Sequence, residues 1–371
     1  MRFLIISHVP HKLYEKQFFG YAPYVREMNI WLKYVDKLEV VAPLSLKTLE
    51  VIDLNYEHKF IKFNRIPALA FLSFKSIFFS LLKLPGIFIT IFKAMRQADH
   101  IHLRCPGNIG LLGCLVQLCF PSKPKTAKYA GNWDPKAKQP VSYKLQKWIL
   151  SQPFLTRNMQ VLVYGAWPHQ SKNIKPFFTA TFKDSEKTPV TLRDYTEALQ
   201  MLFVGSLVAG KRPLYAIQIV EGLIKSGITV RLDLFGDGVL RPELEAYVKE
   251  NGLEPWVVFH GNQDKDVIKT HYKTAHFLIL ASQSEGWPKA VAEAMFFGCI
   301  PIATSVSCVP YMLGDGTKGI LIDTDLQAAI TQITAALQDA MGLKQMSELA
   351  SHWSQQYTLD VFEDAIKKLL E

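Results

Sequence analysis

Two carboxylates near residue 290 lie on a predicted strand, turn and helix. Glu285 lies in the turn, and Glu293 follows about a turn and a half into the helix. The strand at 276–281 is an apolar hexamer, which is typical of a buried parallel strand. Pro288 suits the first helical position, and Gly298 suits the position just past the helix end. Such a strand-to-helix turn is where open parallel sheets bind ligands.

The chemistry of this turn favours an anion that also carries hydroxyl groups. The helix dipole places roughly +0.5 charge at a helix start, where free amides can bind phosphate. Carboxylates accept hydrogen bonds from hydroxyls. A nucleotide-sugar has both features. The alternative is that Lys289 and Glu293 form an ordinary surface pair and that Glu285 is a solvated loop residue.

The segment Glu285-Gly-Trp-Pro-Lys-Ala-Val-Ala-Glu293 resembles the Glu-x7-Glu motif of retaining glycosyltransferases of family GT4. The preceding strand and the Ala-Met-x-x-Gly-x-Pro-Ile continuation resemble that family as well. The resemblance implies that Glu285 is catalytic and accepts hydrogen bonds from the donor sugar, and that Glu293 accepts them from the ribose. It places three further residues on the donor side, namely Gly286, Trp287 and Pro288.

A second motif follows an earlier strand of the same predicted sheet. Lys211, in Gly-Ser-Leu-Val-Ala-Gly-Lys-Arg-Pro, resembles the family lysine that binds the donor diphosphate. Relatives commonly carry an arginine where this chain has Ser206, and Arg212 then supplies the missing charge. Gly205, Ser206 and Arg212 are therefore predicted to bind the donor, with Lys211 catalytic. The alternative is a surface loop with two cations.

Three shorter patterns in the second half have weaker implications. Gly236 begins a Gly-x-Gly turn that is similar to one in the family's second domains but too short for a dinucleotide fingerprint. His260 lies in a segment similar to the loop whose backbone holds the base, and it also suits a structural turn. Asp323 and Asp325 have Asp-x-Asp spacing but precede a helix, so a helix cap is favoured. We predict no metal and no cofactor.

In the first half, three turn residues are predicted on the acceptor side: Arg104, Asn132 and Trp133. They follow strands, at positions that face the crevice of a parallel sheet, although such residues also suit turns. Relatives often have a histidine near Asn132, and this chain departs from that pattern. Gly20 is the one glycine that can stand for the family's Gly-rich loop, in a loop predicted between a strand at 2–7 and a helix at 24–34.

Charge is distributed unevenly along the 371 residues. Net charge is +9, but residues 1–180 carry 25 Lys and Arg against 9 Asp and Glu, whereas residues 181–371 carry 17 against 24. This asymmetry predicts an interaction surface on the first half. No nucleic-acid-binding motif accompanies it, so nucleic acid is disfavoured. An anionic membrane surface or a phosphorylated lipid fits better.

The apolar segment 71–92 bears on the same surface. Lys75 and Lys83 would lie in hydrocarbon if it spanned a membrane, and Pro85-Gly86 would interrupt it. We interpret it as one or two amphipathic helices. They lie either in a membrane interface or in the core with their lysines reaching water.

Composition and alternation predict the organisation of the chain. Apolar residues make up 49%, which is typical of a folded protein. The five cysteines are odd in number and form no Cys-x-x-Cys pair, and the start suits a strand rather than a signal peptide, so a cytoplasmic protein is expected. Strands and helices alternate clearly beyond residue 200. The fold class is α/β, with two facing Rossmann-like doubly wound domains and a crevice between them, the GT-B fold.

The domain limits follow from the same pattern. An acceptor-binding domain is predicted at 1–180 and a nucleotide-sugar-binding domain at 181–371, with the last helix, about 355–371, crossing back to the first domain. Residues 172–196 have no period and are interpreted as a linker.

The resemblance implies a retaining, metal-independent glycosyltransferase. It would move a sugar from a nucleoside diphosphate sugar to an acceptor hydroxyl of a lipid-linked or surface-polysaccharide glycan, at the inner face of the cell membrane. No carboxylate stands out as a nucleophile, so transfer on the front face, assisted by the leaving phosphate, is implied. Three alternatives remain: an epimerase or phosphorylase of the same shape, a Rossmann oxidoreductase, which lacks its Gly-x-Gly-x-x-Gly after the first strand, and a non-catalytic membrane-surface binding protein.

Overall fold

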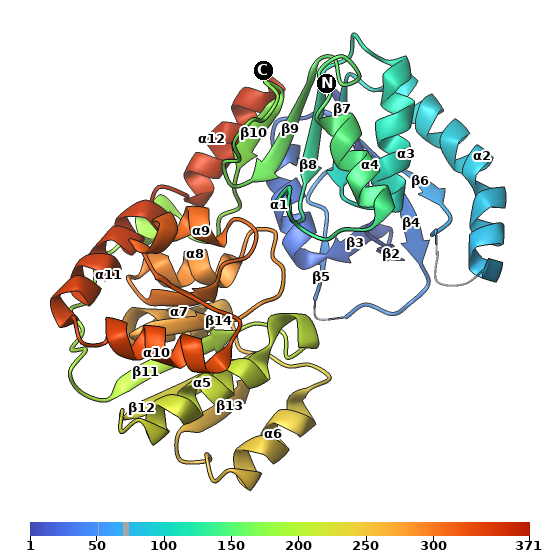
Figure 1. The fold of residues 1–371 in the computed structure, drawn as a ribbon. Coiled ribbons are helices and arrows are strands. Elements are labelled where there is room, and N and C mark those ends of the chain that lie inside the picture. Colours follow the sequence, from blue (N-terminus) through green and yellow to red (C-terminus); the bar gives the residue numbers. More distant parts are fainter. Residues whose placement is uncertain (51, 70–73) are drawn as a thin grey trace. The chain divides into compact units, whose positions relative to one another are not determined.

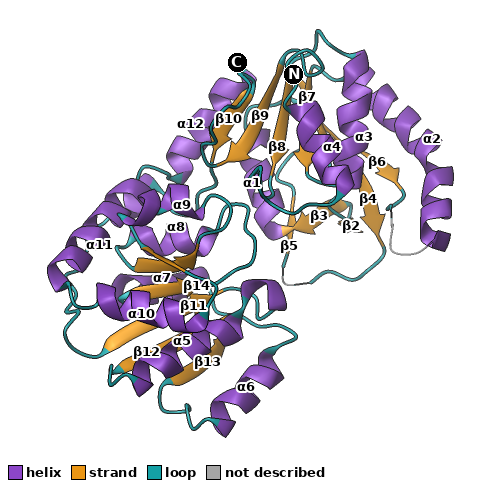
Figure 2. Ribbon diagram, viewed as in Figure 1, coloured by secondary structure: helices purple, strands orange, loops and turns teal. Residues whose placement is uncertain are grey.

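A computed structural model describes residues 1–50, 52–69 and 74–371, which form two compact units (Figure 1). Unit 1 comprises Met1–Phe177 together with Glu363–Glu371, and unit 2 comprises Phe178–Phe362. Each unit contains a Rossmann-like sheet with helices on both faces, which confirms the predicted α/β fold class (Figure 2).

The sheet of unit 1 is built on parallel strands in the order β6-β4-β1-β7-β8-β9-β10, and a small antiparallel extension adjoins β4. The first strand lies inside the sheet and later strands add on both sides, which is the Rossmann order. The strands are β1 (Arg2–Ile6), β2 (His11–Tyr14), β3 (Gln17–Tyr21), β4 (Lys37–Ser45), β5 (Asp53–Asn55), β6 (Ile61–Ile66), β7 (His100–Cys105), β8 (Lys125–Tyr129), β9 (Met159–Tyr164) and β10 (Ile174–Phe177).

The helices of unit 1 cover the two faces of this sheet differently. α2, α3 and α4 form a layer on one face, and α1 lies on the other (Figure 1). Side chains alternate along β7, so that Ile101 and Leu103 join the core under the layer while His102 and Arg104 point to the other face. The helices are α1 (Ala22–Leu32), α2 (Phe74–Gln97), α3 (Asn108–Val116), the short η1 (Gln117–Cys119) and α4 (Val141–Leu150).

Unit 2 repeats the Rossmann order, β13-β12-β11-β14-β15-β16, with every strand parallel to its neighbours. Its strands are β11 (Leu199–Val204), β12 (Val230–Phe235), β13 (Val257–Gly261), β14 (Phe277–Leu280), β15 (Ile300–Thr304) and β16 (Ile320–Ile322).

The helices of unit 2 lie on both faces of its sheet. α5 and α10 pack together over the main apolar core, and α8 and α11 pack together as a second pair. The helices are α5 (Pro213–Lys225), α6 (Arg241–Glu250), α7 (Lys265–Thr274), α8 (Lys289–Phe296), α9 (Val309–Met312), α10 (Leu326–Ala336) and α11 (Ala340–Ser354), with short turns η2 (Asp184–Glu186), η3 (Ala209–Lys211) and η4 (Gly314–Gly316). The last helix, α12 (Leu359–Leu370), begins in unit 2, and its residues from Glu363 onward belong to unit 1.

The structure corrects two predictions about irregular segments. The expected loop after β1 contains the hairpin β2–β3, which turns at Glu15 and Lys16, both with positive φ (47° and 63°). Gly20 therefore lies within strand β3 and not in a Gly-rich turn. The expected linker begins with β10, an edge strand parallel to β9. Short edge strands carry little apolar pattern, and Pro176 is tolerated there because an edge needs fewer hydrogen bonds.

The described part of the segment predicted at 71–92 lies in one helix, α2 (Phe74–Gln97), which continues through Pro85. Residues 71–73 of the predicted segment lie outside the described residues. Thr90 donates a hydrogen bond to the carbonyl of Gly86 (2.8 Å), one turn earlier. Of the helices in the described residues, none has the length and apolarity to cross a bilayer.

Candidate functional site

The two predicted motifs meet at the carboxyl ends of the strands in the unit 2 sheet. β11 and β14 are adjacent parallel strands, so the loops that follow them leave the sheet side by side. The Nζ of Lys211 lies 2.6 Å from Oε1 of Glu285, although 74 residues separate them. The amide of Gln283 donates to the carbonyl of Gly210 (2.9 Å) and ties the loops together. A cation and a carboxylate are thus paired at the carboxyl ends of the strands.

The local backbone presents Lys211 to solvent. Lys211 ends the turn η3, and Arg212 adopts a left-handed conformation (φ 52°, ψ 51°) before Pro213 starts α5. The Lys211 side chain is 32% exposed, whereas that of Glu285 is 8% exposed. An ammonium group has three donors, and one of them binds Glu285. The cation can therefore bind an incoming anion without leaving its partner.

The loop that carries Glu285 is held by a third loop, between β15 and α9. The Ser307 hydroxyl accepts from the amide of Glu285 (3.2 Å) and donates to its carbonyl (2.5 Å). The Cys308 thiol donates to the carbonyl of Gly286 (2.9 Å). Sequence reasoning missed Ser307 and Cys308. The available signal was their position, since they follow β15 at the same edge of the sheet.

The start of α8 is open. Pro288, predicted as the first helical residue, is the N-cap instead, and no side chain caps the helix. Gly298 has φ 74° and follows the C-cap, as predicted. Trp287 is 7% exposed and packs against Trp353 (6.1 Å between ring centroids). The Trp287 ring therefore supports the turn, and the backbone amides at the start of α8 remain suited to an anion.

Glu293 lies on α8 and is half-buried. Its carboxylate accepts hydrogen bonds from the Thr181 hydroxyl (2.7 Å) and the Tyr272 hydroxyl (3.3 Å). Burial raises the pKa of Glu293, and these hydrogen bonds and the charge of Lys289 offset only part of that rise. Within the described residues, no hydrogen bond or ion pair joins Glu293 to Glu285. Glu293 thus sits beside the site, held in place by its own partners.

The predicted glycines allow loops to approach closely. A Cβ on Gly236, whose φ is 133°, would collide with the carbonyl oxygen of Gly205. A Cβ on Gly238 would collide with the carbonyl of Leu207. Ser206, in the same loop as Gly205, is exposed. These glycines place backbone groups, rather than side chains, at this edge of the sheet.

His260 is engaged in a polar cluster on the sheet. Its Nε2 lies 2.7 Å from Oδ1 of Asp233, and its ring stacks on Phe235 (4.5 Å). Burial opposes ionisation of Asp233, but hydrogen bonds from His260 and Gln200 and the charge of Arg231 outweigh it, so the pKa of Asp233 is lowered. These contacts favour the structural alternative for the His260 ring.

Arg212 points to a different partner from Lys211. Its guanidinium lies 4.2 Å from the ring centroid of Tyr215, whose hydroxyl donates to the carbonyls of Asp323 and Asp325. The Asp325 side chain caps α10 by accepting from the amide of Ala328 (2.8 Å), which confirms the predicted helix cap. Across the described residues, no group of three or more His, Cys, Asp and Glu side chains could hold a metal ion.

In unit 1, Arg104 lies in a buried charge cluster. Its guanidinium binds both carboxylate oxygens of Glu27 (2.8 and 3.4 Å), and Lys128 lies 3.3 Å from the same carboxylate. Burial opposes ionisation of Glu27, but the charges of Arg104 and Lys128 outweigh it and lower its pKa to about 2. Arg104 is 8% exposed, so its first role is to hold α1 against the sheet.

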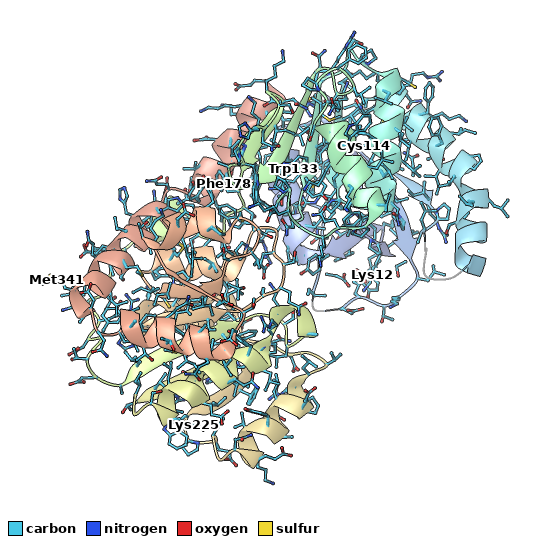
Figure 3. The ribbon with its side chains drawn as sticks, in the orientation of Figure 1. Lys12, Cys114, Trp133, Phe178, Lys225 and Met341 are labelled. Atoms are coloured by element: carbon cyan, nitrogen blue, oxygen red, sulfur yellow. The ribbon has the colours of Figure 1, made fainter. Side chains whose placement is uncertain are left out.

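The structure also places Trp133 and Asn132. Trp133 is 2% exposed, and its indole N–H donates to Gln170 (3.0 Å), among the packed side chains of unit 1 (Figure 3). It cannot stack on an acceptor in this position, which corrects the prediction for Trp133. Asn132 accepts from the amide of Asp134 (2.9 Å) and so forms the turn that the sequence also suggested.

Comparison with solved structures defines the class of fold. A structure of Anabaena HepE in complex with UDP and glucose aligns over 100% of this chain and 99% of that chain, with a TM-score of 0.67 at 14% sequence identity. Sucrose-phosphate synthase from Thermosynechococcus elongatus aligns over 100% and 98%, with a TM-score of 0.65 at 17% identity. Two Rossmann-like units in this order thus make a GT-B fold.

Sequence comparison then relates unit 2 to a family of glycosyltransferases. Residues 184–356, all in unit 2, match the family described as Glycosyl transferases group 1. The D-inositol 3-phosphate glycosyltransferase of Corynebacterium kroppenstedtii is 25% identical over 213 residues, 53% of this chain and 47% of that protein. A GDP-mannose:cellobiosyl-diphosphopolyprenol alpha-mannosyltransferase of Xanthomonas oryzae pv. oryzae is 23% identical over 261 residues, 66% of each. The matches span less than two thirds of either relative. Residues 184–356 of unit 2 are thus similar to group 1 glycosyltransferases, the class that the motifs indicated.

Proposed function

We propose that this chain is a retaining glycosyltransferase that moves a sugar from a nucleoside diphosphate sugar to a hydroxyl of a glycan acceptor. The observation that carries the proposal is the pairing of Lys211 with Glu285 at 2.6 Å, because it assembles two distant donor motifs at one sheet edge. The group 1 match of unit 2 supports the reaction class. The alternatives are the epimerase, the phosphorylase and the non-catalytic binding protein.

The charges suggest how the residues act. When the bond between sugar and diphosphate breaks, negative charge develops on the leaving phosphate. We propose that Lys211 and the uncapped amides of α8 stabilise that charge, which would lower the barrier of the chemical step. Glu285 would accept hydrogen bonds from sugar hydroxyls while Ser307 fixes its backbone. Because this scheme needs no side-chain nucleophile, we propose front-face transfer with retention of configuration.

A lipid-linked acceptor is favoured by the relatives and by the surface of unit 1. The Xanthomonas relative is named for transfer to a diphosphopolyprenol-linked sugar. On unit 1, residues 61–160 contain 15 Lys and Arg and only two acidic residues, Asp99 and Asp134. The layer of α2, α3 and α4 exposes large apolar side chains, including Leu82 (64%), Ile89 (53%) and Trp148 (56%). We propose that this layer rests on an anionic membrane.

The reaction is tested by incubating the full chain with a panel of labelled nucleotide-sugars, with and without polyprenol-linked glycans. The proposal predicts a new glycoside with the donor's anomeric configuration, formed only when acceptor is present, and equally well in a chelator. A changed nucleotide-sugar formed without acceptor would indicate an epimerase. Activity that requires added manganese or magnesium would contradict the metal-independent scheme.

Membrane association is tested by co-sedimentation with phosphatidylglycerol and phosphatidylcholine vesicles. Stronger binding to the anionic vesicles, weakened by salt, is expected, since each cation near the surface contributes about 1 kcal/mol within a Debye length. Trp148→Ser should weaken binding, whereas Met341→Ser, which changes an even more exposed apolar side chain (82%) in unit 2, should not (Figure 3). Equal loss in both variants, or binding that ignores lipid charge, would contradict this assignment.

A further inference from the structure

Unit 1 has a charged cavity at the amino-terminal ends of its parallel strands. The turn residues predicted on the acceptor side lie at the carboxyl-terminal ends. The cavity, of about 510 Å³, opens where β7, β8, β9 and β10 begin, since His100, Lys125 and Met159 at the strand starts line it. Arg104, near the end of β7, and the turn at Asn132, which follows β8, lie at the other ends of these strands. The polar part of the lining consists mainly of Lys125, Arg157, Asn158, Gln160, Lys172 and Lys175.

The charge of this cavity is one-sided. Four of its lining residues are cations, and no Asp or Glu lines it. In the part of the chain that the structure describes, none of Lys125, Arg157, Lys172 and Lys175 takes part in an ion pair. Like charges gathered in a concave site repel one another and focus a positive potential. An anion that enters the cavity relieves this repulsion.

Lys125, at the floor of the cavity, is held in place by hydrogen bonds, whereas the lysines at its rim are exposed. Lys125 is 2% exposed, and its Nζ donates to the carbonyls of Phe120 (2.6 Å) and Lys123 (3.2 Å). Burial lowers the pKa of Lys125 to about 8, so its charge is held in place at an electrostatic cost that a nearby anion would offset. Lys175 in β10 and Lys172, just before this strand, are both exposed, and they can close on a ligand.

Arg157 adds directional recognition at the rim. A guanidinium binds two oxygens of one phosphate at once, which an ammonium group cannot do. Amide side chains of Asn158 and Gln160 offer further donors beside it. The volume lies within the range of small-molecule sites. One guanidinium group and several ammonium groups, with no carboxylate among them, suit a phosphate rather than a neutral sugar.

We propose that this cavity binds a phosphate-bearing ligand, at a site separate from the donor loops of unit 2 and from the acceptor turns of unit 1. The inference does not depend on the proposed transferase reaction. Phosphate esters reach the site from two sources, a lipid headgroup or a soluble phosphate compound. Phe154, 74% exposed beside the rim with the Arg157 guanidinium 4.7 Å from its ring centroid, is the feature that a headgroup would use.

Calorimetric titration of the full chain with inorganic pyrophosphate tests the site directly. Lys172→Gln/Lys175→Gln should weaken binding about tenfold or more, as expected for the loss of charge-assisted hydrogen bonds. Lys249→Gln/Lys344→Gln, which removes two exposed cations from unit 2, is the matched control and should change affinity less than twofold. The donor loops are unchanged in the wild type, the cavity variant and the control variant. Any pyrophosphate bound at these loops is therefore the same in all three proteins and does not affect the comparison.

A second arm separates the sources. The same proteins are mixed with phosphatidylinositol phosphate vesicles and with phosphatidylcholine vesicles. If the cavity variant loses pyrophosphate binding, the site takes soluble phosphate compounds; if it loses only vesicle binding, the site takes a headgroup. Arg157→Gln should give the same pattern as the double variant. If the cavity variants match the control in both arms while their melting temperatures equal that of the wild type, the proposal is overturned.

Discussion

The two units each contain a charge pair near the carboxyl ends of parallel strands, and the pairs differ in burial. In unit 1, Glu27, Arg104 and Lys128 are 7%, 8% and 0% exposed. In unit 2, the Lys211 side chain is 32% exposed while its partner Glu285 is 8% exposed. The first cluster is closed to solvent, and the second has one open side. The buried cluster of unit 1 therefore stabilises the fold, whereas the partly exposed pair of unit 2 can bind a ligand.

The physical reason is the cost of removing charges from water. A buried charge that loses its partner is strongly destabilising, by about 3–5 kcal/mol, because nothing else solvates it. An exposed pair contributes only about 0–1 kcal/mol, because water replaces the lost partner. The same reasoning lets a diphosphate replace part of the hydration of Lys211 at little cost. The comparison predicts stability defects in unit 1 and activity defects in unit 2.

The largest effect is expected for Glu27→Ala. It leaves Arg104 and Lys128 buried without their carboxylate, so the free energy of unfolding should fall by about 3–5 kcal/mol. Chemical denaturation measures this change. Glu50→Ala removes a half-exposed partner of Lys12 in the same unit and should cost no more than about 1 kcal/mol. Equal losses in the two variants would show that burial does not distinguish these pairs.

The lowered pKa of Glu27 also predicts that the chain loses folding stability at acid pH. The pKa of Glu27 is lowered to about 2 in the folded chain, below the unfolded value of about 4.3. Its stabilising contribution is therefore complete above the unfolded pKa and is lost as pH falls through the folded one. In Glu27→Gln, this part of the pH dependence between about pH 4 and pH 2 should disappear.

A smaller effect is expected for Glu293→Gln. The substitution should weaken donor binding but raise the thermal stability of the folded chain. Loss of the charge should weaken donor binding by about 1.5–3 kcal/mol if the ribose donates to this carboxylate. Because burial raises the pKa of Glu293, its ionised form is disfavoured in the folded chain, and its contribution to stability falls as pH rises through that pKa. The variant should therefore gain thermal stability at pH 7 relative to the wild type, and gain less at pH 4.

Donor titration and thermal melting at the two pH values measure both signs. Thr181→Val is a useful companion, because it removes the shorter hydrogen bond to Glu293 but keeps its charge. An unchanged donor dissociation constant in Glu293→Gln would return Glu293 to a structural role. A melting temperature that falls at pH 7 would contradict the burial argument.

The regular part of the fold was predictable because apolar runs repeat in unit 2. The alternation of strands and helices predicted beyond residue 200 is confirmed, for example by α5 (Pro213–Lys225) followed by β12 (Val230–Phe235). The hairpin β2–β3 and the edge strand β10 were not predicted. Their side chains are partly exposed, so they lack the alternation that marks a half-buried strand.

The site was predictable where strand order alone brings residues together. Adjacent strands β11 and β14 place Lys211 beside Glu285, and the family resemblance had singled out both. The partners of Glu293 were not predictable, because Thr181 lies 112 residues away in an irregular segment. Trp133 was misplaced for a related reason, since a turn residue can point into the core as readily as into a crevice.

The most direct test of the account is the turnover of Lys211→Ala at saturating donor. A cation that stabilises charge on the leaving diphosphate should matter most in the transition state, so turnover should fall about a hundredfold or more. The melting temperature is measured in parallel, because the substitution also removes the cation that pairs with Glu285, whose side chain is only 8% exposed. Lys225→Ala, which removes an exposed cation paired with Glu221 in the same unit, should leave turnover unchanged (Figure 3). If Lys211→Ala keeps its turnover, or raises only the donor Michaelis constant, Lys211 does not act on the leaving group and the proposed catalytic role is wrong.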